Sequence, residues 1–274
     1  MPSILIGGLG LLIGSFLNVV VYRLPLKMSL VAPPSACGGC GARIRPWDNV
    51  PVLSWLFLRG RCRDCSVRIS VRYPLIELGT AIFFGLVAWK VLTGAPDGDT
   101  ATAASTTALL LTLAAFLYLA AISVALAIID FDTHTLPNRI VLPAYPVAAI
   151  VLTPASLLGG DSSRLVVAVI GCGVLFGLYL LMALAYPSGM GLGDVKLAGV
   201  LGLFLGWLGL GPLAVGAFSA FLLGGLFSLL LLATRRATRK SGIPFGPWML
   251  AGAWLGIFYG EQIATGYMSL FGLA

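Results

Sequence analysis

Charged residues are scarce in this sequence. They make up 10% of its 274 residues, whereas 59% are hydrophobic, and soluble domains carry roughly 25% charged residues. A mean hydropathy of +1.01 cannot be accommodated in one water-soluble core, because much of the surface would stay apolar and aggregate. The composition therefore excludes a disordered chain and an ordinary soluble enzyme. We expect an all-α, polytopic membrane helix bundle with about eight membrane-spanning helices.

Positive charge is also missing ahead of the first apolar run, residues 4–22. The first basic residue is Arg23, which follows that run. A cleavable signal peptide carries its positive charge before the apolar run. We therefore interpret residues 4–22 as a membrane helix whose N-terminus lies outside and whose other end enters the cytoplasm.

Apolar runs of about 20 residues, the length that crosses ~30 Å of hydrocarbon, recur along the chain. We expect spans at residues 4–22, 74–93, 106–129, 139–157, 165–186, 195–211, 213–234 and 248–269. This topology places both termini outside, together with Asp97, Asp99 and Asp161. Of the 17 basic residues, all but Lys90 and Arg164 then face the cytoplasm, including Arg235, Arg236, Arg239 and Lys240. We find no convincing internal repeat.

The net charge of +7 is concentrated in residues 23–73, where nine basic residues face only Asp48 and Asp64. A basic segment can bind nucleic acid, but a short segment between spans fits better a cytoplasmic loop attracted to anionic lipids. We expect membrane lipids as partners and no nucleic acid. The expected organisation is a first membrane helix at residues 1–23, a cytoplasmic cysteine-rich domain at 24–73 and a membrane core at 74–274.

Four cysteines form two C-x-x-C pairs, Cys37 with Cys40 and Cys62 with Cys65, separated by twenty-one residues. This spacing is typical of a structural Cys₄ zinc site. The segment has few bulky apolar residues, so it needs a cross-link such as this metal site to fold. Two disulfides are the alternative, which a reducing cytoplasm disfavours. Cys172 lies within an apolar span and is interpreted as core filler.

Two acids, Asp130 and Asp194, lie where spans meet the cytoplasmic surface. A carboxylate inside a membrane costs about 2.5–3.5 kcal/mol on an insertion scale, so such acids are functional candidates. Gly191 and Gly193 flank Asp194 and lack Cβ atoms, which lets a substrate backbone approach closely. The alternative is that the acids are interfacial and the glycines serve helix packing.

Two facing carboxyl groups have a known chemistry. Repulsion in a low dielectric makes them share one proton. The ionised partner takes a proton from water, which attacks a peptide carbonyl. The protonated partner donates to the carbonyl oxygen and later to the leaving amine.

The residues around Asp194 carry a resemblance. Gly191-x-Gly193-Asp194 resembles the GxGD signature of intramembrane aspartyl proteases, which include presenilin and signal peptide peptidase. Other segments resemble one branch, the bacterial type IV prepilin peptidases, in that family's order. They are Gly14–Pro25 (GSFLNVVVYRLP), the two cysteine pairs, Asn49–Trp55 (NVPVLSW), Arg72–Glu77 (RYPLIE), Ile129-Asp130 with Leu136-Pro137-Asn138, Gly191–Leu197 (GLGDVKL) and Pro244–Pro247 (PFGP).

The resemblance implies two activities at a bacterial inner membrane. One removes the basic leader from type IV prepilins or pseudopilins on the cytoplasmic side, with aspartates matching Asp130 and Asp194. The other methylates the new N-terminal amine with S-adenosylmethionine. The alternatives are a membrane methyltransferase without proteolysis and a non-enzymatic transporter or assembly scaffold clipped by zinc. The first cysteine pair encloses Gly-Gly where a proline is common, and Asn138 stands where an aspartate is frequent.

Three other polar residues each allow two interpretations. Asn18 and Glu77 either form interhelical hydrogen bonds or hold the polar pilin segment or the methyl donor. Lys196 either anchors its span or contacts a substrate carboxylate or the aspartate pair. Asp132 and His134 are assigned to solvent. No glycine-rich nucleotide motif follows a strand, so the sequence does not place the methyl-donor site.

Overall fold

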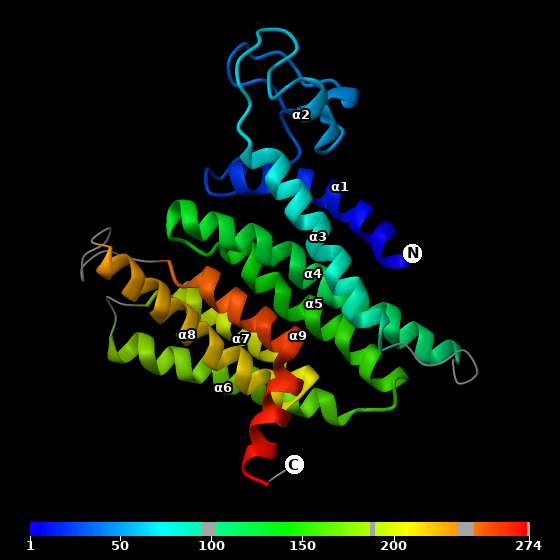
Figure 1. Cartoon of the computed structure of the whole chain (residues 1–274), viewed down its shortest axis with the longest axis vertical. Helices are drawn as coiled ribbons and strands as arrows, with labels where there is room; N and C mark the ends of the chain where they lie inside the picture. The colour runs from blue at the N-terminus through cyan, green and yellow to red at the C-terminus, as the bar shows by residue number, and fades with distance from the viewer. Residues whose placement is uncertain (95–101, 187–189, 235–243, 273–274) are drawn as a thin grey trace. The chain divides into compact units, whose positions relative to one another are not determined.

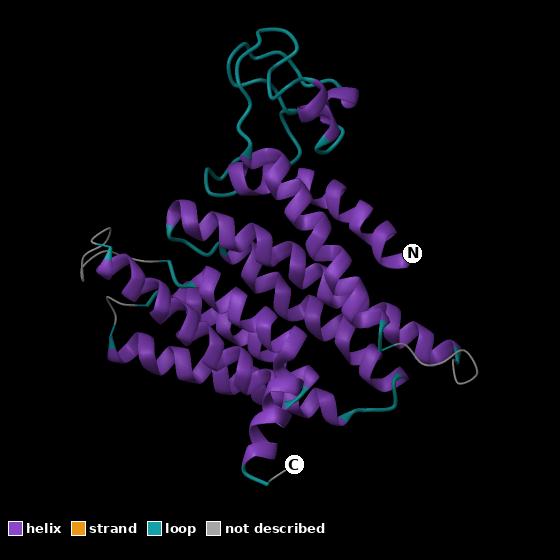
Figure 2. Ribbon diagram, in the orientation of Figure 1, coloured by secondary structure: helices purple, strands orange, loops and turns teal. Residues whose placement is uncertain are grey.

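The structure is a computed structural model that describes residues 1–94, 102–186, 190–234 and 244–272. Figure 2 shows helices joined by loops, and no strand is named in the described residues. The long helices are α1 (Pro2–Arg23), α3 (Arg72–Leu92), α4 (Ala103–Thr133), α5 (Asn138–Leu158), α6 (Ser163–Ala185), α7 (Leu192–Leu208), α8 (Leu210–Ala233) and α9 (Gly246–Leu270), with a short 3₁₀-helix η1 (Pro46–Asn49) and α2 (Leu53–Phe57) between α1 and α3. The expected all-α fold is confirmed.

Six of these helices, α1, α3, α4, α5, α6 and α8, are long and apolar enough to cross a membrane. The chain is thus a multi-pass membrane protein, but the expected count of about eight spans is not confirmed. Helix α7 has 17 residues and is about 26 Å long at 1.5 Å per residue, which is less than the ~30 Å of hydrocarbon. Helix α9 is longer than α7, with 25 residues, but it is not apolar enough to be counted among the six.

Some predicted features fall outside the described residues. These are the acidic pair Asp97 and Asp99 and the basic cluster Arg235, Arg236, Arg239 and Lys240. The side of the membrane on which each loop lies therefore stays a prediction.

The chain divides into two compact units. The first consists of Met1–Gly94 and Phe116–Ala125, and the second of Ala95–Ala115 and Leu126–Ala274. In the first unit α1 packs along α3, and the loops that join these helices carry η1 and α2 (Figure 1). A Cβ atom at Gly14 of α1 would lie 2.7 Å from Cα of Glu77 in α3. Glycine at this position therefore lets the two helix backbones approach closely.

Helix α7 is the centre of the second unit. It packs against α5, α6, α8 and α9, and most of its residues are buried. The contact with α6 depends on glycine, because a Cβ at Gly171 or at Gly202 would overlap the backbone of the other helix. This close fit fixes the N-terminal end of α7, where Asp194 lies.

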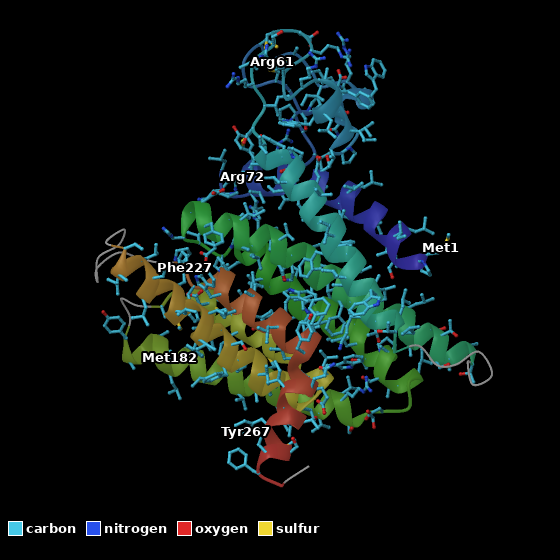
Figure 3. The ribbon with its side chains drawn as sticks, viewed as in Figure 1. Met1, Arg61, Arg72, Met182, Phe227 and Tyr267 are labelled. Carbon is cyan, nitrogen blue, oxygen red and sulfur yellow. The ribbon has the colours of Figure 1, made fainter. Side chains whose placement is uncertain are left out.

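Large apolar side chains cover the outside of the long helices. Met182 of α6 and Tyr267 of α9 are examples that point outward in Figure 3, and every span exposes residues of this kind. Such surface area is stable in a lipid environment and would aggregate in water.

The α6–α7 contact predicts a contrast between two glycines of α6. Gly171→Ala places a methyl group against the α7 backbone and should lower the free energy of unfolding by about 1–3 kcal/mol. Gly173→Ala is the matched control, because its Cβ meets nothing within 4 Å, and it should be neutral or stabilising by up to ~1 kcal/mol. Thermal unfolding in detergent measures both, and equal melting temperatures would contradict this packing.

Candidate active site and metal site

Asp130 is a buried carboxyl group near the C-terminal end of α4, and the residue is only 4% exposed. The helix runs to Thr133, beyond the predicted end of the span at residue 129. His134 ends the helix in a left-handed conformation, with φ of 51°, and its N–H donates to the Asp130 carbonyl at 2.9 Å. The Asp130 side chain therefore leaves the last turn of a regular helix, whose backbone holds it in place.

The Asp130 carboxyl group has a built-in hydrogen-bond donor. The backbone N–H of Gly246 donates to its Oδ2 at 3.1 Å, although 116 residues separate the two. A Cβ at Gly246 would lie 2.7 Å from the same oxygen, so only glycine allows this approach. The preceding Phe245 packs against Tyr179 and Phe221, with ring centroids 6.2 and 5.5 Å away. This aromatic cluster fixes the position of the Gly246 N–H.

Asp194 lies in the first turn of α7. Its Oδ2 accepts a hydrogen bond from the Gly191 N–H at 3.1 Å. This is the return half of a capping box, in which an acid in the first turn satisfies the backbone ahead of the helix. Negative charge is also favourable at a helix N-terminus. The residue is half-buried, so its carboxyl group is fixed and still reachable.

Leu136 links the surroundings of the two acids. A Cβ at Gly193, next to Asp194, would lie 3.0 Å from Leu136 Cβ, and a Cβ at Gly246 would lie 3.2 Å from Leu136 Cδ2. The second unit therefore contains both acids, and Leu136 lies beside the glycine that precedes Asp194 and the glycine that donates to Asp130.

The other residues predicted for this site have specific neighbours. Leu136 packs against Gly193. A Cβ at Gly191 would meet its nearest neighbour, Asp194 Oδ2, at an ordinary 3.6 Å. The Lys196 ammonium donates to the Asn138 side-chain oxygen at 3.1 Å rather than to either aspartate. Asp132 and His134 are exposed, and Cys172 is half-buried in α6.

The four paired cysteines come together in the first unit. The sulfurs of Cys37, Cys40, Cys62 and Cys65 all lie within 4.8 Å of one another, and all are free thiols. The Cys37 and Cys65 sulfurs are 3.7 Å apart. A tetrahedral zinc ion with Zn–S bonds of about 2.3 Å requires sulfurs about 3.8 Å apart. The donor set therefore fits zinc, and the disulfide alternative is not formed.

Each cysteine pair sits in the same backbone turn. The first turn is closed by a bridge between Ala36 and Arg43, and the second by a bridge between Arg61 and Arg68. The residue after each pair, Gly41 or Ser66, has a positive φ of 72° or 57°. The sequence C-x-x-C-x-x-R-I occurs at residues 37–44 and again at 62–69. This short internal repeat corrects our finding that the sequence contains none.

Two of the thiols have opposite pKa shifts. Hydrogen bonds from the backbone of Cys40 and Gly39 lower the pKa of Cys37 to about 6. The Val67 backbone lowers the pKa of Cys65, but burial and the neighbouring thiols outweigh it and raise the value to about 12. A divalent cation at the centre of the cluster favours thiolate at all four positions.

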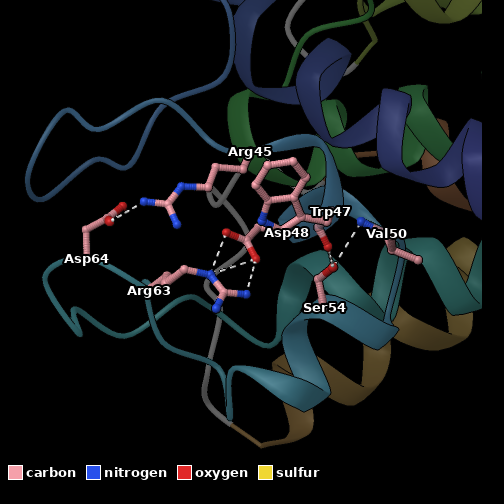
Figure 4. A network of polar contacts seen from close by, with 7 residues as sticks. All are labelled: Arg45, Trp47, Asp48, Val50, Ser54, Arg63 and Asp64. Atoms are coloured by element: carbon pink, nitrogen blue, oxygen red, sulfur yellow. Dashed lines mark hydrogen bonds and ion pairs between the residues drawn. The ribbon is translucent and has the colours of Figure 1, made fainter.

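Ion pairs join the two halves of the cysteine-rich segment, as Figure 4 shows. Arg63, between Cys62 and Cys65, contacts both carboxylate oxygens of Asp48, and Arg45 pairs with Asp64 at 3.1 Å. The hydrogen bond from Arg63 lowers the pKa of Asp48. The Arg45–Asp64 pair is exposed, and such pairs contribute only about 0–1 kcal/mol, whereas the Asp48 carboxylate is largely covered.

Asn18 and Glu77 lie in the first unit, whereas both aspartates lie in the second. The Asn18 amide donates to the Tyr73 carbonyl at 3.2 Å, which is the interhelical bond expected as one interpretation. Glu77 Oε2 accepts a hydrogen bond from the Val52 N–H at 2.7 Å. Both side chains line a cavity of about 690 Å³.

Gly246 and Leu136 are site residues for which the sequence analysis assigned no role. Both lie in short motifs that carried the resemblance, PFGP and LPN. A glycine between two prolines is a signal of a close backbone approach, but it does not identify the partner.

Comparisons with known proteins find relatives over most of the chain. The profile described as the Bacterial Peptidase A24 N-terminal domain matches residues 9–91, and that of the Type IV leader peptidase family matches residues 117–233. A Pseudomonas putida protein named prepilin leader peptidase/N-methyltransferase is 38% identical, over 96% of this chain and 93% of its own length. Proteins of the same name from Pseudomonas aeruginosa and Neisseria gonorrhoeae are 36% and 34% identical, over 96% and 90% of this chain and 92% and 87% of their own lengths. No solved structure matches.

Proposed function

The chain belongs to the type IV leader peptidase family, and we propose that Asp130 and Asp194 are the two carboxyl groups with which it cleaves its substrate. Its activities are those of a prepilin leader peptidase and N-methyltransferase, acting on type IV prepilins. One observation carries the assignment of the residues. Leu136 lies beside both Gly193, which precedes Asp194, and Gly246, which donates to Asp130, and each acid accepts a hydrogen bond from a backbone N–H.

The two acids divide the work of hydrolysis between them. The ionised carboxyl group takes a proton from water, which attacks the peptide carbonyl, and the protonated one donates to the carbonyl oxygen. The proton then passes to the leaving amine as the C–N bond breaks. The backbone donors at Gly191 and Gly246 keep both carboxyl groups oriented through this cycle. The pair shares its protons, so an apparent pKa belongs to the site and not to either residue.

We place the site at the cytoplasmic face of the bacterial inner membrane, with both termini outside. The basic segment 23–73 supports this orientation, because positive loops remain in the cytoplasm beside anionic lipids. A prepilin or pseudopilin enters as an apolar helix, so its polar leader stays at the surface and presents the scissile bond to the aspartates. A Cβ at Gly191 would make only ordinary contacts, the nearest being 3.6 Å from Asp194 Oδ2, so this position leaves room for a substrate backbone beside the acid.

Substituting either aspartate should abolish cleavage. Asp130→Asn and Asp194→Asn keep the side-chain shape but remove the acid, and each should slow leader removal at least about 1000-fold. Asp132→Asn is the control, since Asp132 lies two residues from Asp130 and is exposed. Mass spectrometry of a prepilin incubated with the purified variants gives the readout.

The same experiment separates the alternatives. A methyltransferase without proteolysis would show no cleavage by the wild-type protein, and a scaffold would leave the peptide both uncut and unmethylated. Cleavage that survives in Asp194→Asn would refute the assignment of the pair.

We propose that the cysteine cluster binds one structural zinc ion. A closed Cys₄ site leaves no position for a substrate, so it stabilises a fold and does not catalyse. The near-tetrahedral spacing of the sulfurs supports this role. The Arg45–Asp64 pair is exposed on both sides and the Arg63–Asp48 pair on the arginine side, so the zinc site would be the main cross-link of the segment.

Elemental analysis of the reduced, purified protein should find about one zinc per chain. Replacing any one of Cys37, Cys40, Cys62 or Cys65 with serine should remove most of it, because serine does not supply a thiolate. Cys172→Ser is the matched control and should retain the metal. The proposal fails if the wild-type protein contains no zinc or if Cys172→Ser loses as much as the others.

We propose that the second activity uses S-adenosylmethionine as its methyl donor. The lone pair of the new N-terminal amine forms the N–C bond while the C–S bond breaks, its electrons stay on sulfur, and the amine loses a proton. The protein's part is to bind the donor and to orient the amine.

A further inference from the structure

The first unit contains a cavity of about 690 Å³ for which the hydrolytic chemistry has no use. Its wall combines residues of α1 and α3 with the loops that carry the cysteines, including Cys37 and Cys62. Sites for small organic ligands typically enclose about 300–1,000 Å³. The space is therefore of the right size for a nucleoside-sized ligand.

Glu77 places a buried carboxyl group in this cavity. The residue is 8% exposed, and within the described residues only its Oε2 is engaged, by the Val52 N–H. Val52 has a φ of 60°, a conformation that a β-branched residue rarely adopts and that costs about 1–3 kcal/mol. The chain thus accepts strain to aim a donor at Glu77, and Oε1 remains available for a donor from a ligand.

Arg23 supplies the opposite charge. It too is 8% exposed, and its guanidinium donates to the carbonyls of Ser29 and Pro33 at 3.0 and 2.6 Å. No carboxylate is its partner among the described residues. A guanidinium has five N–H donors, so donors remain for an anion. The cavity therefore has a buried cation and a buried carboxyl group that are not paired with each other.

Aromatic residues complete the lining. Tyr22, Trp55 and Tyr73 all border the cavity, and the Trp55 indole N–H is fixed by the Ile69 carbonyl at 3.2 Å. Aromatic rings favour stacking with a flat base and contact with a cation. The lining thus suits a molecule with a base, a cationic centre and both an ammonium and a carboxylate group.

We infer that this cavity is the binding site for S-adenosylmethionine. Arg23 binds the carboxylate of the ligand, Glu77 accepts hydrogen bonds from its ammonium group or ribose hydroxyls, and the aromatic residues contact the base or the sulfonium. This inference rests on the methyltransferase activity of the proposed function. It gives Glu77 a binding role in addition to its contact with Val52.

The test measures binding without any prepilin. Calorimetry with S-adenosylhomocysteine, the non-reactive product, is run on the full-length protein in detergent. Glu77→Gln keeps an oxygen for the Val52 N–H but loses the charge, and it should weaken binding at least about tenfold. Glu261→Gln in α9 is the matched control outside the cavity and should bind like the wild-type protein. Unchanged affinity in Glu77→Gln, or equal loss in both variants, overturns the inference.

A second measurement needs no variant. Ultraviolet cross-linking of S-adenosylmethionine to the wild-type protein, followed by peptide mapping, should label the peptides that contain Tyr22, Trp55 or Tyr73. Labelling confined to the second unit overturns the site but leaves the methyltransferase activity intact if the same protein methylates a cleaved prepilin. A wild-type protein that neither binds the probe nor methylates refutes that activity, and the inference with it.

Discussion

A carboxyl group buried in an apolar helix bundle must find its hydrogen-bond partners inside the protein, because no water or lipid supplies them. Asp130 meets this constraint with the backbone N–H of Gly246 rather than with a basic side chain. A neutral donor orients the oxygen without neutralising the acid, as an ion pair with lysine or arginine would. Lys196, two residues after Asp194, is likewise no partner of the acids and is engaged by Asn138. The acids therefore keep the freedom to exchange a proton.

That arrangement depends on close helix packing. Gly246 can donate to Asp130 only because it has no Cβ, and α7 can bring Asp194 to the same place only because Gly171 and Gly202 let it settle against α6. In a bilayer, lipid tails compete equally for apolar side chains, so tight packing at small residues does much of the work of association. Close packing at these glycines thus holds the helices that carry the acids in position.

The sequence predicted the all-α fold and singled out both acids, because a charge within an apolar run is costly and so rarely accidental. It gave no hint that Gly246, 116 residues away, is the donor to Asp130, since a backbone bond between distant helices leaves no local pattern. The predicted span at residues 195–211 rests on hydropathy. The helix found there, α7, is short and central and is buried by protein on most sides. Hydropathy does not distinguish burial in protein from burial in lipid.

The separation of chemistries between units has a physical reason. Hydrolysis needs water and a shared proton, whereas methyl transfer needs a lone pair on an amine and a dry pocket that holds a charged donor. With zinc bound as proposed, the cysteine-rich segment that borders the cavity with Arg23 and Glu77 would keep the second reaction apart, and its shape would depend on four thiolates rather than on a hydrophobic core. Loss of the metal should therefore reach the cavity first, because Cys37 and Cys62 form part of its wall.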